Sequence, residues 1–368
     1  MKTKKWTALL LTGMLGVSML TGCGINKNAV VASMQGQEVT LGLASFMCKY
    51  QQAQSDDMYR SWFGDEVWNG DLFGSGSTMA ESMREEVMQE LHNMYTLYAH
   101  QSDYKVELTE DENKAITDAA KKFMDANEEA TIREMGATQE IVEEFLRLYT
   151  VKQSMYEQII KEADTNISDE EANMRAYSMV EVALDQETDE EGNQKVYSPE
   201  ESAEIKKRAQ EFATRVKNGA KLEDTAKEYG YECTENTYAK DDDVLAKEVK
   251  EALDALKAGE VSALVTTDTS AYVLRLDSET DKEATEEHKA NILTERQEEC
   301  FNKKLEEWQK DDGWKVKENQ LKKIEFDSRL TQENPDKKDD DSTETVEDGS
   351  EIEGTEVEEN EGTQKDAE

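Results

Sequence analysis

The chain has 368 residues, a formal net charge of −41 and 35% charged residues, but only two prolines. A surface this acidic repels nucleic acid and anionic lipid headgroups, so we expect neither as a partner. The length exceeds what one small core needs, and we expect two domains.

The first residues have the pattern of a secretory signal. Three lysines among the first five residues precede an apolar run over residues 6–20, which is short for a membrane span. The run ends in LTGC (residues 20–23), which resembles the lipobox of bacterial lipoproteins. That resemblance implies a signal peptide over residues 1–22 and a mature protein outside the cytoplasm, anchored to the bacterial cell membrane by acyl chains on Cys23. The alternative is a buried cysteine behind a signal anchor.

The following segment, residues 23–165, is predicted to be a helical domain. AVVASMQGQEVTL (29–41) alternates and turns like a short hairpin, after which Thr40 opens a helix. Thr78 and Thr109 each have Glu three residues later, the pattern of a capping box, and Thr138 caps a helix that follows a Gly stop.

Methionines and aromatic residues gather in this helical segment, and two interpretations are open. A methionine-rich surface adapts to varied unfolded clients. The same residues at helical spacing also suit an ordinary core. Our candidate client-binding residues are Met79, Met83, Met94 and Trp62.

Residues 166–280 change to an α+β pattern. RAYSMVEVALD (175–185) alternates like a strand, and the polar loop after it leads to Ser198-Pro199-Glu200-Glu201, a helix start with cap, N1 proline and N3 Glu. Two further short helices and a closing pair of strands give the order β-α-α-α-β-β. The segment is large enough for its own core.

The chain then returns to a helix. Residues 281–328 are expected to form one long helix and a short end that pack on the N-terminal domain, because the apolar stripe of this helix cannot be buried alone. Residues 329–368 are acidic and nearly without apolar side chains, so we expect a disordered tail.

Cysteines and histidines are few. After Cys23 only Cys48, Cys233 and Cys300 remain, an odd number far apart, which implies no disulfide framework. The sequence has three histidines and neither a CxxC nor an HExxH motif. We expect no metal site and no cofactor.

Three stretches resemble the parvulin-type foldases, a family that includes PrsA-like lipoproteins and SurA-like periplasmic chaperones. They are VVASMQGQEVTLGLASF (30–46), RVKNGAKLEDTAKEYG (215–230) and LKAGEVSALVTTDTSAYVLRLD (256–277). The resemblance implies a helical SurA-like chaperone domain formed by both ends of the chain, with an inserted parvulin-like peptidyl-prolyl isomerase domain. Its implied partners are unfolded or partly folded exported proteins, and a homodimer is left open.

The catalytic pattern of that family is incomplete here. Parvulins lower the barrier to rotation about X-Pro bonds, which is about 18–20 kcal/mol for a peptide bond, in a groove that usually holds two histidines. Tyr272 stands where the second histidine belongs and Ser178 near the first, and residues 101–287 contain no histidine. The resemblance places Cys233, or Glu232, at the acid or thiol position, and Thr269 at the hydroxyl position.

Each of these groove residues has a simpler interpretation: a core thiol for Cys233, a turn hydroxyl for Thr269 and strand packing for Tyr272. We therefore expect an extracytoplasmic foldase or chaperone with weak or no isomerase activity. The alternative is a fully active peptidyl-prolyl isomerase, since twisting an amide needs desolvation and positioned dipoles rather than obligatory proton transfer. A solute-binding or wall-structural lipoprotein is disfavoured, because the repeated βαβ pattern of binding-protein lobes is missing.

Overall fold

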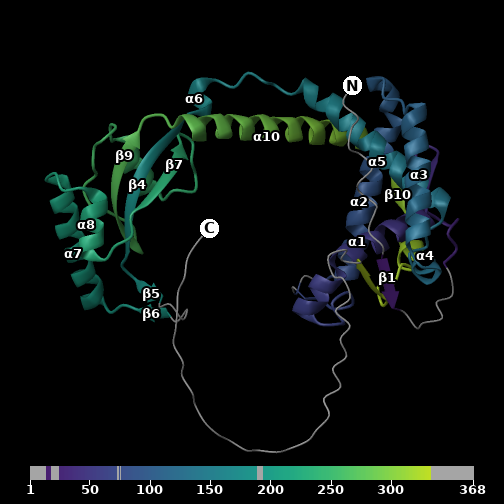
Figure 1. Ribbon diagram of the computed structural model, residues 1–368, viewed down its shortest axis with the longest axis horizontal. Helices are drawn as coiled ribbons and strands as arrows, with labels where there is room; N and C mark the ends of the chain where they lie inside the picture. The colour runs from purple at the N-terminus through teal and green to yellow at the C-terminus, as the bar shows by residue number, and fades with distance from the viewer. Residues whose placement is uncertain (1–13, 18–24, 73, 75, 189–193, 333–368) are drawn as a thin grey trace, which may run out of the picture.

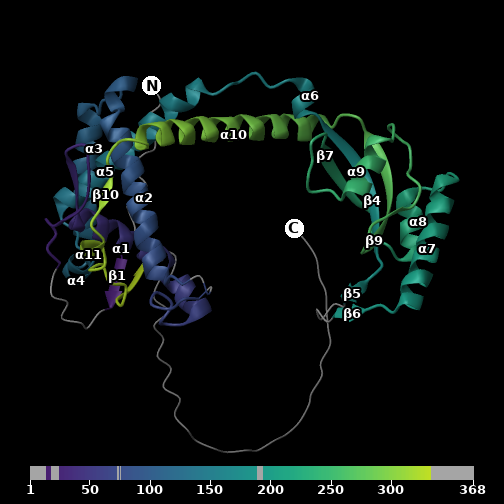
Figure 2. The ribbon, with the colours of Figure 1, turned by 180° about the vertical axis from the view of Figure 1, so that it is seen from behind.

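A single long helix, α10 (Lys282–Gln309), joins a helical body to an α+β body. The computed structural model describes residues 14–17, 25–72, 74, 76–188 and 194–332. Figures 1 and 2 show the two bodies at opposite ends of α10, with the thin linker after α5 running beside it. Both ends of the described chain lie in the helical body, as the resemblance implied.

The helical body contains five helices and a small sheet from the N-terminal half of the chain. Its helices are α1 (Leu41–Phe63), α2 (Met79–Ala99), α3 (Glu110–Ala126), α4 (Glu129–Glu134) and α5 (Gln139–Ile159), with the 3-10 turns Gln101–Tyr104 and Ile160–Glu162. The predicted hairpin is β2 (Val30–Met34) and β3 (Gln37–Thr40).

The predicted helix starts are confirmed. Thr40 and Thr138 accept hydrogen bonds from the backbone N–H groups three residues later, and Thr78 and Thr109 form complete capping boxes. Each cap satisfies N–H groups that have no partner inside the helix. Because these signals are local, the helix starts could be predicted without knowledge of the tertiary structure.

The C-terminal segment completes the helical body. β10 (Lys315–Val316) adds to β2, and α11 (Glu318–Leu321) and β11 (Arg329–Gln332) follow it. The ring of Phe326 stacks on Trp68 with centroids 5.2 Å apart. Since Trp68 is buried, this segment is part of the core and packs on the N-terminal helices.

Two of the three histidines take part in the same packing. His92, on α2, stacks on Trp314 at 4.5 Å, and its Nε2 lies 2.6 Å from Asp312 Oδ2. His100 stacks on Trp308, near the end of α10, at 4.3 Å. Both imidazoles therefore hold the C-terminal segment against α2.

The end of the described chain differs from the predicted disordered tail. Residues 329–332 form β11, in which Leu330 is buried and its N–H donates to Asp56 Oδ2 at 3.0 Å. The packed chain thus extends four residues beyond residue 328. Residues 333–368 lie outside the described residues.

The predicted signal peptide lies outside the described residues except for one strand. β1 (Met14–Val17) pairs antiparallel with β11, with Gly16 opposite Leu330. Cys23 and the peptide bond that precedes it are not among the described residues.

The α+β body is built on a four-stranded antiparallel sheet in the order β7-β4-β9-β8. Its strands are β4 (Met174–Ala183), β7 (Thr234–Ala239), β8 (Val265–Thr266) and β9 (Ser270–Ser278), and its helices are α7 (Pro199–Lys217), α8 (Leu222–Tyr229) and α9 (Lys247–Asp254). Helices α7 and α8 cover one face and α9 covers the other.

The order of elements in this body differs from the predicted β-α-α-α-β-β. β7 lies between α8 and α9, and β5 (Gln186–Thr188) pairs with β6 (Gln194–Val196) where only a loop was expected. β7 is an edge strand, and only Tyr238 and Ala239 in it are buried. Its sequence therefore lacks the alternation that marks a strand.

The bridge consists of α10 and the linker that runs back beside it. At 1.5 Å per residue its 28 residues span about 42 Å. Arg296, near its middle, donates to Asn166 O at 3.0 Å and to Glu171 Oε1 at 2.5 Å, where Glu171 belongs to α6 (Asp169–Ala172). At the start of α10, the Asp281 N–H donates to Met174 O at 2.7 Å. These bonds tie α10 to the linker and to the first strand of the α+β body.

Candidate functional site

The register between β4 and β9 decides which residues share a face of the sheet. Tyr272 lies opposite Glu181, and Leu274 lies opposite Met179, so the side chains of these pairs are on the α9 side. Ser178 points to the other face, where its hydroxyl donates to Asp277 Oδ2 at 2.6 Å. Its oxygen also accepts from Arg275. The residue that shares the face of Tyr272 near the first histidine position is therefore Met179, not Ser178.

An apolar shelf lies on the α9 side of the sheet. It consists of Met179, Leu245, Val265 and Tyr272, all half-buried. Beneath it Val249, Leu253 and Leu274 are fully packed. A partly exposed apolar surface suits a proline ring, which has no polar atom of its own.

Tyr272 is the polar member of this shelf. Its hydroxyl donates to Glu181 Oε1 at 2.9 Å. Burial raises the pKa of Tyr272, and the hydrogen bond to the Glu181 carboxylate adds to this effect. The phenol is therefore a neutral hydrogen-bond donor at physiological pH and cannot serve as a base.

A wider cleft begins on the other side of Glu181. It has a volume of about 780 Å³. We call it the acidic cleft, and its lining comprises Glu181, Val182, Ala183, Asp185, Gln186, Glu187, Tyr197, Ile205, Arg208, Gly230, Tyr231, Glu232, Thr269 and Ser270. Thr269 and Glu232, two of the residues that the resemblance pointed to, are in this lining.

Cys233 is not part of the cleft lining. It packs half-buried among the apolar residues under α7 and α8. Burial raises the pKa of its thiol, and the nearby carboxylate of Glu223 raises it further. A thiol held in its protonated form is a poor nucleophile. The structure thus brings Thr269 and the Tyr272–Glu181 pair to one region, with Cys233 on the opposite face of the sheet.

No histidine reaches either the shelf or the cleft within the described residues. His288, the third histidine, lies on α10, where its Nδ1 is 3.0 Å from Ala172 O. The polar side chains at the shelf and the cleft are hydroxyls, carboxylates, the amide of Gln186 and the guanidinium of Arg208. The carboxylates at the end of β4, above all Glu181, were missed by the sequence analysis, although a charged residue inside the apolar run MVEVAL was a visible signal.

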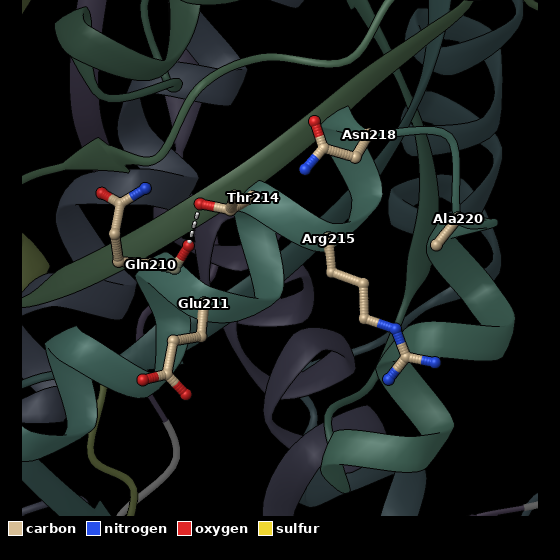
Figure 3. A pocket seen from close by; sticks show the side chains of 6 residues that line it. All are labelled: Gln210, Glu211, Thr214, Arg215, Asn218 and Ala220. Atoms are coloured by element: carbon tan, nitrogen blue, oxygen red, sulfur yellow. Dashed lines mark hydrogen bonds between the residues drawn. The ribbon is translucent and has the colours of Figure 1, made fainter.

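A second cleft in the α+β body lies along the outer side of α7. Figure 3 shows its lining, where the Thr214 hydroxyl donates to Gln210 O at 2.7 Å and Arg215 points toward α8. Arg215 pairs with Glu228 at 2.5 Å. The cleft holds none of the predicted site residues.

In the described part of the helical body, the large apolar side chains that are exposed gather at the end of α1. Trp62 is 66% exposed, Phe63 44% and Met58 43%, and the rings of Trp62 and Phe63 have centroids 6.3 Å apart. We call these three residues the α1 patch. In Figures 1 and 2 the dark-blue segment around the end of α1 projects from the helical body on the side that faces the α+β body.

The four candidate client-binding residues separate in the structure. Trp62 is in the α1 patch, whereas Met94 is only 2% exposed and belongs to the core. Met79 and Met83 are half-buried against that core. These methionines of α2 therefore pack in or against the core, and the exposed apolar surface lies on α1 instead.

Known proteins are similar to this chain both in the α+β body and over most of its length. Residues 175–290 match the family described as the PPIC-type PPIASE domain. A foldase protein PrsA of Clostridium botulinum is 24% identical over 273 residues, which cover 68% of this chain and 80% of that protein. A foldase protein PrsA of Clostridium tetani is 22% identical over 333 residues, covering 84% of this chain and 94% of its own length.

Solved structures of similar chains include PrsA from Lactococcus lactis, with 17% identity, a TM-score of 0.32 and coverage of 80% of this chain and 97% of that chain. PrsA from Bacillus subtilis has 18% identity and a TM-score of 0.23, and the match covers 81% and 98% of the two chains. In the described part of this chain, no helix has the length and apolar character needed to cross a bilayer. The domain match, together with relatives that span most of its length, supports a PrsA-like parvulin foldase.

Proposed function

We propose that this protein is an extracytoplasmic chaperone that holds unfolded exported proteins, and that its parvulin-like domain is catalytically weak or silent. The exposed α1 patch is the observation on which the proposal depends. A tryptophan that is 66% exposed beside an exposed phenylalanine is unusual on a chain with so charged a surface. Such a patch gains free energy when an apolar segment of a client covers it.

The surroundings of the apolar shelf support the second part of the proposal, that isomerase activity is weak or absent. The hydroxyl of Tyr272 is already bonded to Glu181, so it must leave that carboxylate before it can reach a substrate amide. Cys233 is on the other face of the sheet. The groove therefore offers an apolar shelf for proline but few free dipoles to stabilise a twisted amide.

One experiment with two readouts tests both parts. The purified chain is assayed for isomerisation of a proline tetrapeptide and for suppression of aggregation of an unfolded protein. We expect protection of the client with little or no acceleration of isomerisation. A rate acceleration that disappears in the variants Tyr272→Phe and Thr269→Ala would establish the alternative, a fully active isomerase.

The variant Trp62→Ser tests the α1 patch. Loss of one interfacial tryptophan typically costs about 1–2 kcal/mol, so client affinity should fall about tenfold. Val196→Ser is the matched control, because Val196 is an exposed apolar residue of the other body. Equal protection by the two variants would contradict a role of the patch in client binding.

The second candidate, full isomerase activity, is favoured by one observation. Thr269 is exposed on the cleft, and the apolar shelf adjoins it through Glu181 and Tyr272. A proline on the shelf would lie near these hydroxyl groups. Catalysis would then depend on desolvation and hydrogen bonding rather than on proton transfer to histidine.

We also propose that the chain is a lipoprotein anchored through Cys23 after removal of residues 1–22. The support is the lysine-rich start, the short apolar run and the LTGC motif. Cleavage would remove β1, yet β11 would keep its bond from Leu330 N–H to Asp56. Metabolic labelling with a fatty-acid analogue should mark the wild type and not Cys23→Ala. A homodimer stays a prediction for sedimentation velocity to test.

A further inference from the structure

The apolar shelf and the acidic cleft meet at the Tyr272–Glu181 hydrogen bond. Tyr272 belongs to the shelf, and Glu181 belongs to the cleft lining. The apolar lining of the cleft, Val182 and Ile205, is on the α7 side of the sheet, whereas the shelf is on the α9 side. An extended peptide with its proline on the shelf would therefore reach the cleft by passing around Glu181, a path of a few residues at about 3.3 Å per residue.

Four carboxylates give the cleft its charge. They are Glu181, Asp185, Glu187 and Glu232, and all four residues are exposed. None of them forms a salt bridge with a described residue. Among the described residues, Glu181 and Glu187 accept hydrogen bonds from the neutral phenols of Tyr272 and Tyr197 alone.

The one cation of the lining is already engaged. Arg208 donates to Tyr229 O at 2.6 Å, and its guanidinium lies over the rings of Tyr229 and Tyr231, 5.6 and 5.4 Å from their centroids. Lys195, opposite Glu187 in the β5–β6 pair, forms its salt bridge with Glu201. Since Arg208 also forms no salt bridge with the four carboxylates, negative charge is in excess at the cleft.

The cleft also has features that match a long side chain. Val182 and Ile205 supply apolar lining against which methylene groups can pack. The hydroxyl oxygen of Tyr231 is shielded from solvent and has no hydrogen-bond partner among the described residues. Such a group is satisfied when a ligand brings a donor or a peptide carbonyl to it.

We propose that the acidic cleft selects client segments in which a lysine or arginine lies within a few residues of a proline. The proline occupies the shelf, the aliphatic stem of the basic residue packs on Val182 and Ile205, and its charged end meets the carboxylates of Glu181, Glu187 and Glu232. This inference deepens the proposed function, on which it rests, by naming the class of peptide that the parvulin-like body recognises.

Fluorescent octapeptides with one central proline test the inference. The residues flanking the proline are both Lys, both Gln or both Glu, and the rest of the sequence is constant. Binding to the full chain is measured by fluorescence anisotropy at low and at physiological salt. We expect the Lys peptide to bind about three- to tenfold more tightly than the Gln peptide, with a smaller gap at higher salt.

A matched pair of variants separates the cleft from the overall acidity. Glu187→Gln with Glu232→Gln removes two charges from the cleft, and Glu295→Gln with Glu299→Gln removes two exposed charges from α10. The preference for the Lys peptide should shrink in the first double variant and persist in the second. An equal loss in both would mean that net charge alone attracts the peptide, and would overturn the inference.

The outcome also separates this inference from the proposed function. If the chain protects an unfolded client but binds Lys and Gln peptides equally, the cleft is not selective and the chaperone proposal stands. If the chain binds none of the peptides and protects no client, both are wrong. A Lys preference that survives Glu187→Gln with Glu232→Gln would place the selective site elsewhere and refute the role of the cleft.

Discussion

Replacing Asp56 with alanine should destabilise the helical body far more than replacing its neighbour Asp57. The Asp56 carboxylate has no exposed surface and accepts three hydrogen bonds, from Trp68 Nε1 at 2.6 Å, Arg60 Nε at 2.9 Å and Leu330 N at 3.0 Å. It therefore joins α1 to the turn after it and to β11.

The magnitude follows from what the substitution leaves behind. Arg60 loses a buried ion-pair partner, which typically costs about 3–5 kcal/mol. The Trp68 indole and the Leu330 amide lose their acceptor in the same place, so these effects overlap and are not added. Among the described residues, Asp57 forms one salt bridge, a solvent-exposed pair with Arg329 worth about 0–1 kcal/mol.

Tryptophan fluorescence isolates the relevant transition. All five tryptophans lie outside residues 174–281, so the α+β body is silent in this assay. For a body of this size, Asp56→Ala should lower the unfolding temperature by about 6–20 °C, and Asp57→Ala by about 4 °C or less. Equal shifts in the two variants would refute the conclusion that Asp56 holds these three segments together.

Three further predictions concern the α+β body and the bridge. In Ser262→Ala the buried Leu274 N–H loses its bond to the serine hydroxyl, which should cost about 1–3 kcal/mol in urea unfolding followed by circular dichroism. The backbone N–H of Ser198 lowers the pKa of Glu201 to about 2. The Glu201 carboxylate therefore stabilises the fold fully above its unfolded pKa of about 4.3, and this stabilisation disappears as the pH falls toward 2. Urea midpoints between pH 5 and 2 should therefore depend less on pH in Glu201→Gln; an unchanged slope would contradict this. Arg296→Ala should broaden the distance distribution between spin labels on the two bodies and leave both unfolding midpoints unchanged, whereas an unaltered distribution would mean that the linker needs no such tie.

Local signals in the sequence were enough to place most helices. The capping boxes at Thr78, Thr109 and Ser198 are read within four residues, and the structure contains all three. Contacts between distant residues were beyond such reasoning. The hydrogen bonds from Gln52 to the carbonyls of Phe326 and Ser328 join positions more than 270 residues apart. The sequence around Gln52 contains no pattern that predicts them.

The sequence indicated which segments carry the candidate site, but not which face of the sheet each side chain points to. The resemblance led to Tyr272 and Thr269, which lie at the shelf and the cleft. It led to Ser178 rather than Met179 because a shift of one residue moves a side chain to the other face of a sheet. The irregular pairing between Ala176 and Tyr177 shows that the register of β4 depends on its partner β9, which a strand sequence alone does not reveal.

The length of the bridge sets the scale of a client segment that could contact both bodies at once. The α1 patch and the apolar shelf belong to bodies joined by a helix of about 42 Å. An extended chain covers about 3.3 Å per residue. An unfolded client segment of about 13 residues is as long as that helix. Such a segment gains from two weak contacts because the second becomes intramolecular once the first has formed. A folded protein with short loops cannot do so, and this difference would let the chain distinguish unfolded clients from folded ones without high affinity at either site.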